Sequence, residues 1–204
     1  MTRRAVFIDR DGTLSEEVGY VNHIDRLRLI DGSANAIRRL NQAGLQTVLV
    51  TNQAGVARGY FDEQMVADVH ERLRALLIEH GARLDGIYYC PHHPDVGETP
   101  YRQDCECRKP GPGMLLRARE EMGIDLSSSY IVGDSFKDLR AGAAVGATPI
   151  LVLTGYGKGQ YEHQSTDWPF RPQFVAADLV QAVDWILQRE ADRPSARVNT
   201  GTED

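Results

Sequence analysis

The chain has 204 residues, of which 42% are hydrophobic and 25% are charged, and its formal net charge is -6. This length suits one domain with its own hydrophobic core, and the composition is typical of a soluble globular protein. The acidic balance disfavours a nucleic-acid partner, and no apolar run approaches the ~20 residues that a membrane helix needs.

Two features bear on the compartment. The apolar run near the N-terminus covers only Ala5 to Ile8 before Asp9 ends it, so we expect no secretory signal. The 3 cysteines cannot complete a set of disulfides, which indicates metal binding or catalysis in a reducing environment. We therefore expect a cytoplasmic, monomeric protein with no membrane partner.

Short apolar runs alternate with helical patterns along the chain. In chain order we predict a strand at 5–8, a helix at 33–44, a strand at 45–50, a helix at 62–81, a strand at 86–90, a helix at 112–123, a strand at 130–133, a helix at 138–145, a strand at 149–153 and a helix from 178. Strands interleaved with helices predict an α/β fold with a Rossmann-like parallel sheet covered by helices on both faces.

Two segments fall outside this alternation. Segment 155–172 is rich in glycine, proline and polar residues, so we expect an irregular surface loop with no assigned role. Residues 191–204 have few apolar side chains and are expected to be a disordered tail. Residues 1–190 are therefore expected to form a single domain.

Polar residues follow three of the predicted strands, at Asp9, Thr51 and Asp134. Ligands of parallel α/β sheets bind beyond the carboxyl ends of the strands, so we expect these side chains to meet. Asp9 and Asp11 stand at positions i and i+2, which point to the same side of an extended chain. An ordinary Asp-Gly turn would explain Asp11 but not Asp9, whose charge beside a buried strand is costly without a partner. Two close carboxylates suit Mg²⁺ and phosphate chemistry.

Four segments in order resemble the motifs of the haloacid dehalogenase-like phosphatases. Residues 6–14 match the first motif, an apolar strand followed by Asp-x-Asp-Gly-Thr. Thr51 is similar to the second motif, Lys109 to the third, and the segment IVGDSFKD, with Asp134 and Asp138, to the fourth. The gaps between these motifs are too short for the usual cap domain, so the resemblance implies a capless protein with an open site.

The resemblance implies a phosphatase mechanism with named roles. Asp9 would be the nucleophile that forms an aspartyl-phosphate, and Asp11 would protonate the leaving oxygen and then activate water. A catalytic Mg²⁺ would bind Asp9, the backbone carbonyl of Asp11 and Asp134.

Three further residues receive roles only through this resemblance. Thr51 and Lys109 would bind the phosphoryl oxygens, and Asp138 would orient the surrounding groups rather than bind metal. Without the family, Lys109 is interpreted as an ordinary surface lysine and Asp138 as a helix-start residue.

The cysteines form a second candidate metal site. Cys90 and His92 form a C-x-H pair, and after twelve residues Cys105 and Cys107 form a C-x-C pair. This Cys3His set is a known composition of tetrahedral zinc sites, and because all four positions are filled we expect structural Zn²⁺. His93 is the nearest competitor of His92.

Zinc would fix a loop that is poor in core-forming residues. It would also fix Arg108 and Lys109, which directly follow the second ligand pair. The planar guanidinium of Arg108 is expected to bind a remote phosphate or sugar hydroxyls. The remaining histidines are expected at the surface: His23, His70, His80 and His163.

Within the superfamily, the chain resembles the D-glycero-D-manno-heptose 1,7-bisphosphate 7-phosphatases, through DRDGT, Gly-Tyr-Val at 19–21, TNQ-G-ARG at 51–59, the Cys-His-Cys-Cys loop and RKP. The implied reaction removes the C7 phosphate of this phosphorylated sugar, with the anomer left open. The implied substrate-binding residues are Glu17, Val18, Gly19, Tyr20, Thr51, Asn52, Gln53, Ala54, Arg108 and Lys109. Ser135 occupies a position that varies between relatives, and no role is expected for it.

Two alternatives remain. Histidinol-phosphate phosphatases have a similar zinc loop, although with a shorter gap between the ligand pairs. A zinc-stabilised binding module could keep the fold without catalysis, but such a module would be expected to lack Asp9 or Asp11, and both are present.

Overall fold

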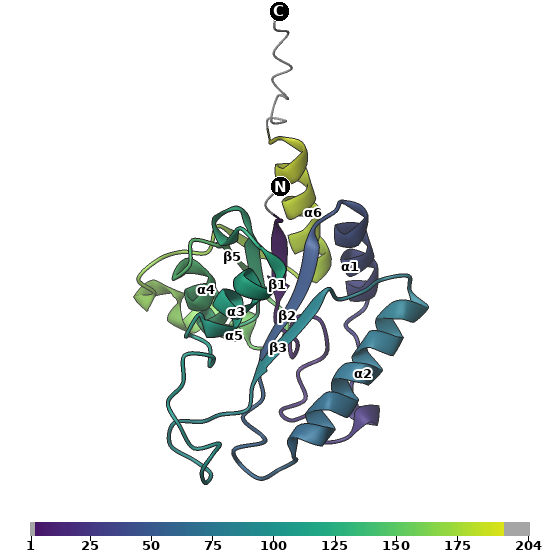
Figure 1. Ribbon diagram of the computed structural model, residues 1–204. Helices are drawn as coiled ribbons and strands as arrows, with labels where there is room; N and C mark the ends of the chain where they lie inside the picture. The colour runs from purple at the N-terminus through teal and green to yellow at the C-terminus, as the bar shows by residue number, and fades with distance from the viewer. Residues whose placement is uncertain (1–2, 194–204) are drawn as a thin grey trace, which may run out of the picture.

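The computed structural model describes residues 3–193, which form a six-stranded sheet with helices on both faces (Figure 1). Every neighbouring pair of strands is parallel, and the strand order is β3-β2-β1-β4-β5-β6. The strands are β1 (Ala5–Ile8), β2 (Gln46–Asn52), β3 (Gly86–Cys90), β4 (Tyr130–Gly133), β5 (Thr148–Val152) and β6 (Phe174–Ala176).

The first five helices connect successive strands, and α6 follows the last strand. They are α1 (Ser33–Gln42), α2 (Glu63–Glu79), α3 (Gly113–Met122), α4 (Phe136–Ala143), α5 (Gly157–Gln164) and α6 (Leu179–Ala191). Short 3-10 turns lie at Ile24–Arg26, Leu126–Ser128 and Ser165–Asp167.

Two clusters of buried side chains hold the helices to the sheet. Val6 and Ile8 of β1 belong to a cluster with side chains of α1, α2 and α6. Ala5 and Phe7 belong to a second cluster with side chains of α3 and α4. Successive residues of β1 therefore point to opposite faces, and both faces are apolar, as in a central parallel strand. The predicted α/β fold is confirmed.

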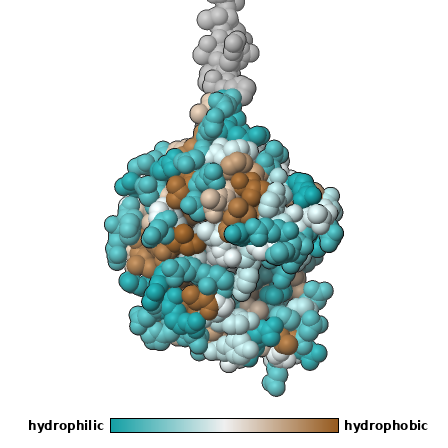
Figure 2. Space-filling view, turned by 180° about the vertical axis from the view of Figure 1, so that it is seen from behind, coloured by the Kyte–Doolittle hydropathy of each residue, from teal (hydrophilic) through white to brown (hydrophobic). Residues whose placement is uncertain are grey.

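The surface differs from these clusters. In the view of Figure 2 it is mostly hydrophilic, and the hydrophobic residues form separate patches. No helix within residues 3–193 combines the length and the apolar character needed to cross a membrane.

Capping residues set the helix starts. Asp62 Oδ1 accepts a hydrogen bond of 2.9 Å from the backbone N–H of Met65 at the start of α2, as expected of an N-cap. The helix predicted from residue 138 begins earlier, at Phe136, because Ser135 caps it and Asp138 completes a capping box. Ser135, for which no role is expected from the sequence, therefore lies just after β4 and caps α4.

The segment 155–172 is not the irregular loop that its composition predicted. It contains α5 and the 3-10 turn that follows. Gln160 of α5 accepts a hydrogen bond of 2.9 Å from the backbone N–H of Phe136, and so satisfies a donor in the first turn of α4. This tertiary contact stabilises a helix whose own sequence has no strong apolar face.

Other differences concern ends and edges. β2 runs to Asn52, beyond the predicted strand at 45–50, because Asn52 pairs with Cys90 of β3. The edge strand β6 was not predicted, since three residues are too few for a periodic pattern. Ala191, expected in the tail, is the last residue of α6, and the tail lies outside the described residues from position 194.

Candidate active site and metal centre

A cavity of about 350 Å³ lies where β1, β2 and β4 end. Because β1 lies between β2 and β4, residues far apart in the sequence meet at this edge of the sheet. The cavity is lined by Asp9, Asp11, Glu17, Gly19, Thr51, Asn52, Lys109, Asp134, Ser135, Lys137, Asp138, Tyr156 and Gln160. The three polar residues that follow the predicted strands are all among them.

Lys109 lies between two carboxylates. Its Nζ lies 2.7 Å from Asp9 Oδ1 and 2.5 Å from Asp138 Oδ1, and it donates to the backbone carbonyl of Val50 at 2.8 Å. Only 3% of the Lys109 side chain is exposed. Burial alone would lower the pKa of this ammonium, but Asp138 and Asp9 together raise it above its ordinary value, so Lys109 stays charged.

The carboxylates outnumber the cations here. Burial raises the pKa of Asp9 to about 7, against the opposing effect of Lys109. Burial, followed by the charges of Asp9 and Asp138, raises the pKa of Asp134 to about 8. Asp9, Asp134 and Asp138 each offer a carboxylate oxygen within 4.8 Å of the others. A divalent cation would offset the excess negative charge, and oxygen ligands are those that Mg²⁺ prefers.

Two of the three carboxylates fit such a cation better than the third. Asp9 and Asp138 are both paired with Lys109, but Asp138 Oδ2 also accepts a hydrogen bond of 3.1 Å from the backbone N–H of Ser135. Asp134 Oδ2 accepts only one contact of this kind, 2.8 Å from the N–H of Tyr156. The donor set therefore matches Asp9 and Asp134 as metal ligands, with Asp138 as an orienting group.

Two glycines let loops close on Asp134. A Cβ built at Gly12 or at Gly155 would lie 2.1 Å from Asp134 Oδ2. Gly12 also has a φ of +78°, a conformation that other residues rarely adopt. The Gly of the Asp-x-Asp-Gly segment is thus required by its proximity to the carboxylate as well as by the turn.

Asp11 is held by a buried network. Arg10 Nε and one terminal nitrogen donate to its two carboxylate oxygens at 3.0 and 2.9 Å. Gln53 Nε2 donates to Asp11 Oδ2 at 3.0 Å and to Thr51 Oγ1 at 2.8 Å. The other terminal nitrogen of Arg10 lies 3.4 Å from His70 Nε2.

His70 was expected at the surface, and this expectation is wrong. The residue is only 6% exposed, on the inner side of α2. Burial, followed by the charge of Arg10, lowers the pKa of His70 to about 3. His70 is therefore neutral at physiological pH and can accept a hydrogen bond from Arg10.

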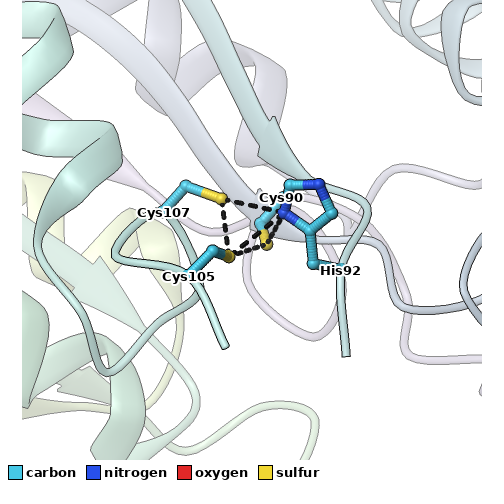
Figure 3. A group of neighbouring side chains, drawn as sticks. All are labelled: Cys90, His92, Cys105 and Cys107. Carbon is cyan, nitrogen blue, oxygen red and sulfur yellow. Dashed lines mark hydrogen bonds between the residues drawn. The ribbon is translucent and has the colours of Figure 1, made fainter. Parts of the chain in front are cut away.

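The second candidate metal site lies at the carboxyl end of β3 (Figure 3). His92 Nδ1 lies 3.8, 3.1 and 3.4 Å from the sulfurs of Cys90, Cys105 and Cys107. The sulfur of Cys105 lies 3.5 Å from that of Cys90 and 3.0 Å from that of Cys107, and all three cysteines are free. Ligands of one tetrahedral zinc ion are separated by ~3.3 to 3.8 Å, so this cluster has nearly the required size.

His93 does not join this cluster. Its Nε2 lies 3.3 Å from a terminal nitrogen of Arg58 instead. The structure thus gathers the four residues that the C-x-H and C-x-C spacing predicts, and it places the competing histidine elsewhere.

The loop that carries the cluster is attached to α2 and to the active site. Tyr101 and Tyr89 both donate to the carboxylate of Glu63, at 2.8 and 2.5 Å. Arg108 donates to the backbone carbonyl of His92 at 3.1 Å. Lys109, which follows, reaches the cavity.

The sequence-predicted substrate residues divide into two groups. Five line the cavity: Glu17, Gly19, Thr51, Asn52 and Lys109. The other five lie outside the lining: Val18, Tyr20, Gln53, Ala54 and Arg108. Val18 packs against the core, and the Tyr20 ring packs against Tyr60 at 4.9 Å.

The lining also includes residues that sequence reasoning missed. Lys137, Tyr156 and Gln160 come from α4, from the loop after β5, and from α5. Lys137 lies within the IVGDSFKD segment and so could have been considered from the sequence. The other two lie in a segment interpreted as an irregular loop, where no pattern marks them.

A family model, curated proteins and a solved structure all match this chain, and their names agree with one another. The HAD-hydrolase-like family model matches residues 106–182. The D-glycero-beta-D-manno-heptose-1,7-bisphosphate 7-phosphatase of Photorhabdus laumondii subsp. laumondii is 49% identical over 194 residues, which cover 94% of each chain. The protein of that name from Yersinia pestis is 44% identical over 193 residues, again 94% of each chain. A solved D,D-heptose 1,7-bisphosphate phosphatase from B. bronchiseptica, complexed with magnesium and phosphate, has a TM-score of 0.80 and 35% identity, covering 91% of this chain and 99% of that one.

Proposed function

We propose, because this chain belongs to the D-glycero-β-D-manno-heptose-1,7-bisphosphate 7-phosphatase family, that it removes the C7 phosphate of this sugar bisphosphate. The observation that carries the proposal is the meeting of Asp9, Asp11, Lys109 and Asp134 at one cavity. The sequence left the anomer open, and the names of the relatives favour the β form.

The first step is attack by the Asp9 carboxylate on phosphorus. The bond between phosphorus and the C7 oxygen breaks, and Asp11 gives a proton to the departing oxygen. Water then attacks the aspartyl-phosphate while Asp11 takes its proton, which releases phosphate and restores Asp9. The position of Asp11, two residues after Asp9 and on the cavity wall, supports both of its roles.

A Mg²⁺ ion held by Asp9, Asp134 and the backbone carbonyl of Asp11 would reduce the repulsion between the anionic nucleophile and the anionic phosphate. The excess of carboxylates over cations among the cavity residues supports this assignment. Asp138 keeps its role as the partner of Lys109.

Lys109 and Thr51 would bind the phosphoryl oxygens. In the structure, Lys109 Nζ donates to Asp9 and to the carbonyl of Val50, and it forms an ion pair with Asp138. Donation to a phosphoryl oxygen would replace the donation to Asp9. The Asp9 carboxylate loses its negative charge as its oxygen bonds to phosphorus, so the ammonium can then donate to the phosphoryl group.

The second phosphate of the substrate needs a cation of its own. Lys109 is neutralised by two carboxylates, whereas Lys137 is an exposed cation on the cavity wall. Arg108 lies outside the cavity lining but next to Lys109 in the sequence, and it donates one N–H to the His92 carbonyl. We assign the remote phosphate to Lys137 together with Arg108.

Structural Zn²⁺ is proposed for the cluster of Cys90, His92, Cys105 and Cys107. The near-tetrahedral spacing of the four ligand atoms supports it. Zinc there would hold the chain just before Arg108 and Lys109, so it acts on the position of these residues rather than on the reaction.

A competition assay tests the proposed function. The purified protein with Mg²⁺ is given the β and α anomers of heptose 1,7-bisphosphate, histidinol phosphate and fructose 1,6-bisphosphate, and kcat/KM is measured for each. We expect the β-heptose bisphosphate to be preferred, with phosphate released from C7. A preference for histidinol phosphate would instead support the alternative family, and no hydrolysis of any substrate would support a binding module.

A further inference from the structure

We propose that Arg10 is a positioning residue, whose buried guanidinium holds the carboxylate of Asp11 in the orientation that proton transfer requires. This inference deepens the proposed function and rests on it, because it takes Asp11 as the acid and base of a phosphatase. Arg10 itself is not among the residues that line the cavity.

The Arg10 side chain is 1% exposed, and each of its nitrogens has a defined partner. Nε and one terminal nitrogen bind the two oxygens of Asp11 at 3.0 and 2.9 Å, in a bidentate pair. The same terminal nitrogen donates to Gln53 Oε1 at 2.9 Å, and the other lies 3.4 Å from His70 Nε2. Arg10 is therefore fixed from three sides, and it fixes both oxygens of one carboxylate.

Stability alone does not account for this arrangement. Removing a guanidinium from water is costly, and buried ion pairs are often no more stabilising than apolar residues of similar volume. The partner of Arg10 is a residue that must meet the substrate, and its side chain is 19% exposed at the cavity. A rigid donor pair behind a reactive carboxylate limits its rotation, and small errors in placement cost large factors in rate.

Gln53 and His70 complete this arrangement. Gln53 accepts from Arg10 and donates to Asp11 Oδ2, so it supports both members of the ion pair. His70, on α2, offers its ring nitrogen to the nitrogen of Arg10 that does not touch Asp11. The two oxygens of Asp11 thus depend on groups that closely follow the ends of β1 and β2 and, through Arg10, on a side chain of α2.

The chemistry of the side chain predicts which substitution is informative. A lysine at position 10 keeps the charge but has a single nitrogen, so it cannot bind both carboxylate oxygens in a plane. If Arg10 merely supplied positive charge, Arg10→Lys would retain activity. If it positions Asp11, Arg10→Lys should lose kcat while KM changes little.

The first measurement uses the whole Mg²⁺-loaded protein and two substrates. On heptose bisphosphate, we expect Arg10→Lys to lower kcat by ~10- to 100-fold with KM within about threefold. On p-nitrophenyl phosphate, whose leaving group needs no proton, the first step should proceed and the second should be slow. Rapid mixing should therefore show a burst of one p-nitrophenolate per active site, which a loss of folded protein would not produce.

The second measurement is a double-mutant cycle with Asp11→Asn. If Arg10 acts through Asp11, adding Arg10→Lys to Asp11→Asn should lower kcat by less than about twofold further. Arg4→Lys is the matched control, because Arg4 precedes the same strand and is paired with Glu190 at the opposite end. This control should retain wild-type kcat.

The outcomes separate this inference from the proposed function. Wild-type kcat in Arg10→Lys, or an equal loss in the Asp11→Asn background, would overturn the positioning role. Failure of the wild-type protein to hydrolyse either substrate would instead overturn the proposed function. If Arg10→Lys does not fold, Gln53→Met is tested in its place, because it removes one hydrogen bond from Arg10 and one from Asp11. The proposal then requires Gln53→Met to lower kcat, with less than about a twofold further loss in the Asp11→Asn background.

Discussion

Asn52 and Lys109 exchange two hydrogen bonds of 3.0 Å each. The side-chain amide of Asn52 donates to the backbone carbonyl of Lys109, and its oxygen accepts from the backbone N–H of the same residue. The end of β2 is thereby bonded to the loop that follows the cysteine cluster. Asn52 was predicted to bind substrate, but this pair gives it a structural task as well.

Replacing Asn52 by alanine should therefore affect kcat more than KM, because Lys109 loses its attachment to the sheet. Asn41→Ala is a matched control: Asn41 donates to Thr47 and accepts from the N–H of Arg83 at the other end of β2. Both variants should lose ~1 to 3 kcal/mol in the free energy of unfolding, but only Asn52→Ala should lower kcat. A rise in KM alone would indicate a substrate contact instead. Urea unfolding and steady-state kinetics supply both measurements.

Asp9→Asn should abolish turnover while the fold persists. The substitution keeps the shape of the side chain but removes the attacking charge, so kcat should fall by at least ~1000-fold, with an unchanged circular dichroism spectrum. Exhaustive EDTA treatment of the wild-type protein should also stop turnover, and Mg²⁺ should restore it. Hydrolysis by Asp9→Asn at a normal rate, or full activity in EDTA, would contradict the mechanism.

Freshly purified, reduced protein should contain about one zinc per chain, measured by elemental analysis. Cys107→Ser should lower both the zinc content and kcat, because the loop before Lys109 loses an anchor. His93→Ala removes the neighbouring histidine that faces Arg58, so it should leave the zinc content unchanged. Protein without zinc but with full activity would exclude the proposed site.

His70 should make stability depend on pH. Its pKa is about 3 in the folded protein and 6.5 in the unfolded chain, so unfolding takes up a proton between these values. Its contribution to the free energy of unfolding is therefore fully present above pH 6.5, and it falls by up to ~1.4 kcal/mol per pH unit as pH is lowered through this window. The stability difference between the wild type and His70→Gln should be constant above pH 7 and should shift against the wild type below pH 6. A difference that stays constant down to pH 4.5 would contradict this.

Lys137→Ala and Arg108→Ala should reduce discrimination between one and two phosphates. Each removes a cation assigned to the remote phosphate, so kcat/KM on heptose bisphosphate should fall by ~10-fold or more, with a smaller loss on p-nitrophenyl phosphate. Lys158→Ala, on α5 but outside the cavity lining, is the control. Equal losses of kcat/KM on both substrates would show that these residues support the general stability of the site rather than the recognition of the second phosphate.

The parts of the fold that follow local patterns were predictable. The five strands and five helices predicted from apolar periodicity are all present, with ends displaced by a few residues. α5 was missed because a contact remote in sequence, between Gln160 and Phe136, stabilises it, and β6 was missed because three residues show no periodic pattern. An isolated segment does not carry that information.

In the candidate site, too, local patterns predicted some features, and contacts between distant parts of the chain determined the others. Strand ends and cysteine spacing predicted which residues would gather at the two centres. They did not predict which side chains face the cavity: Gln53 points to Asp11 and Arg10, while Lys137 lines the wall. The burial of His70 was also missed, because a polar residue on the inner side of a helix has no apolar signature.

A single residue separates Cys107 from Lys109. Under the proposed assignment, zinc therefore affects the number of competent molecules, and magnesium affects their rate. Zinc, by holding the loop before Lys109, would set the fraction of molecules in which Lys109 is in place. Magnesium, in exchange with the solvent, would set the rate at which each of those molecules works. Scarcity of zinc would then lower the number of competent enzymes without changing their affinity for substrate, whereas scarcity of magnesium would slow all of them together and reversibly.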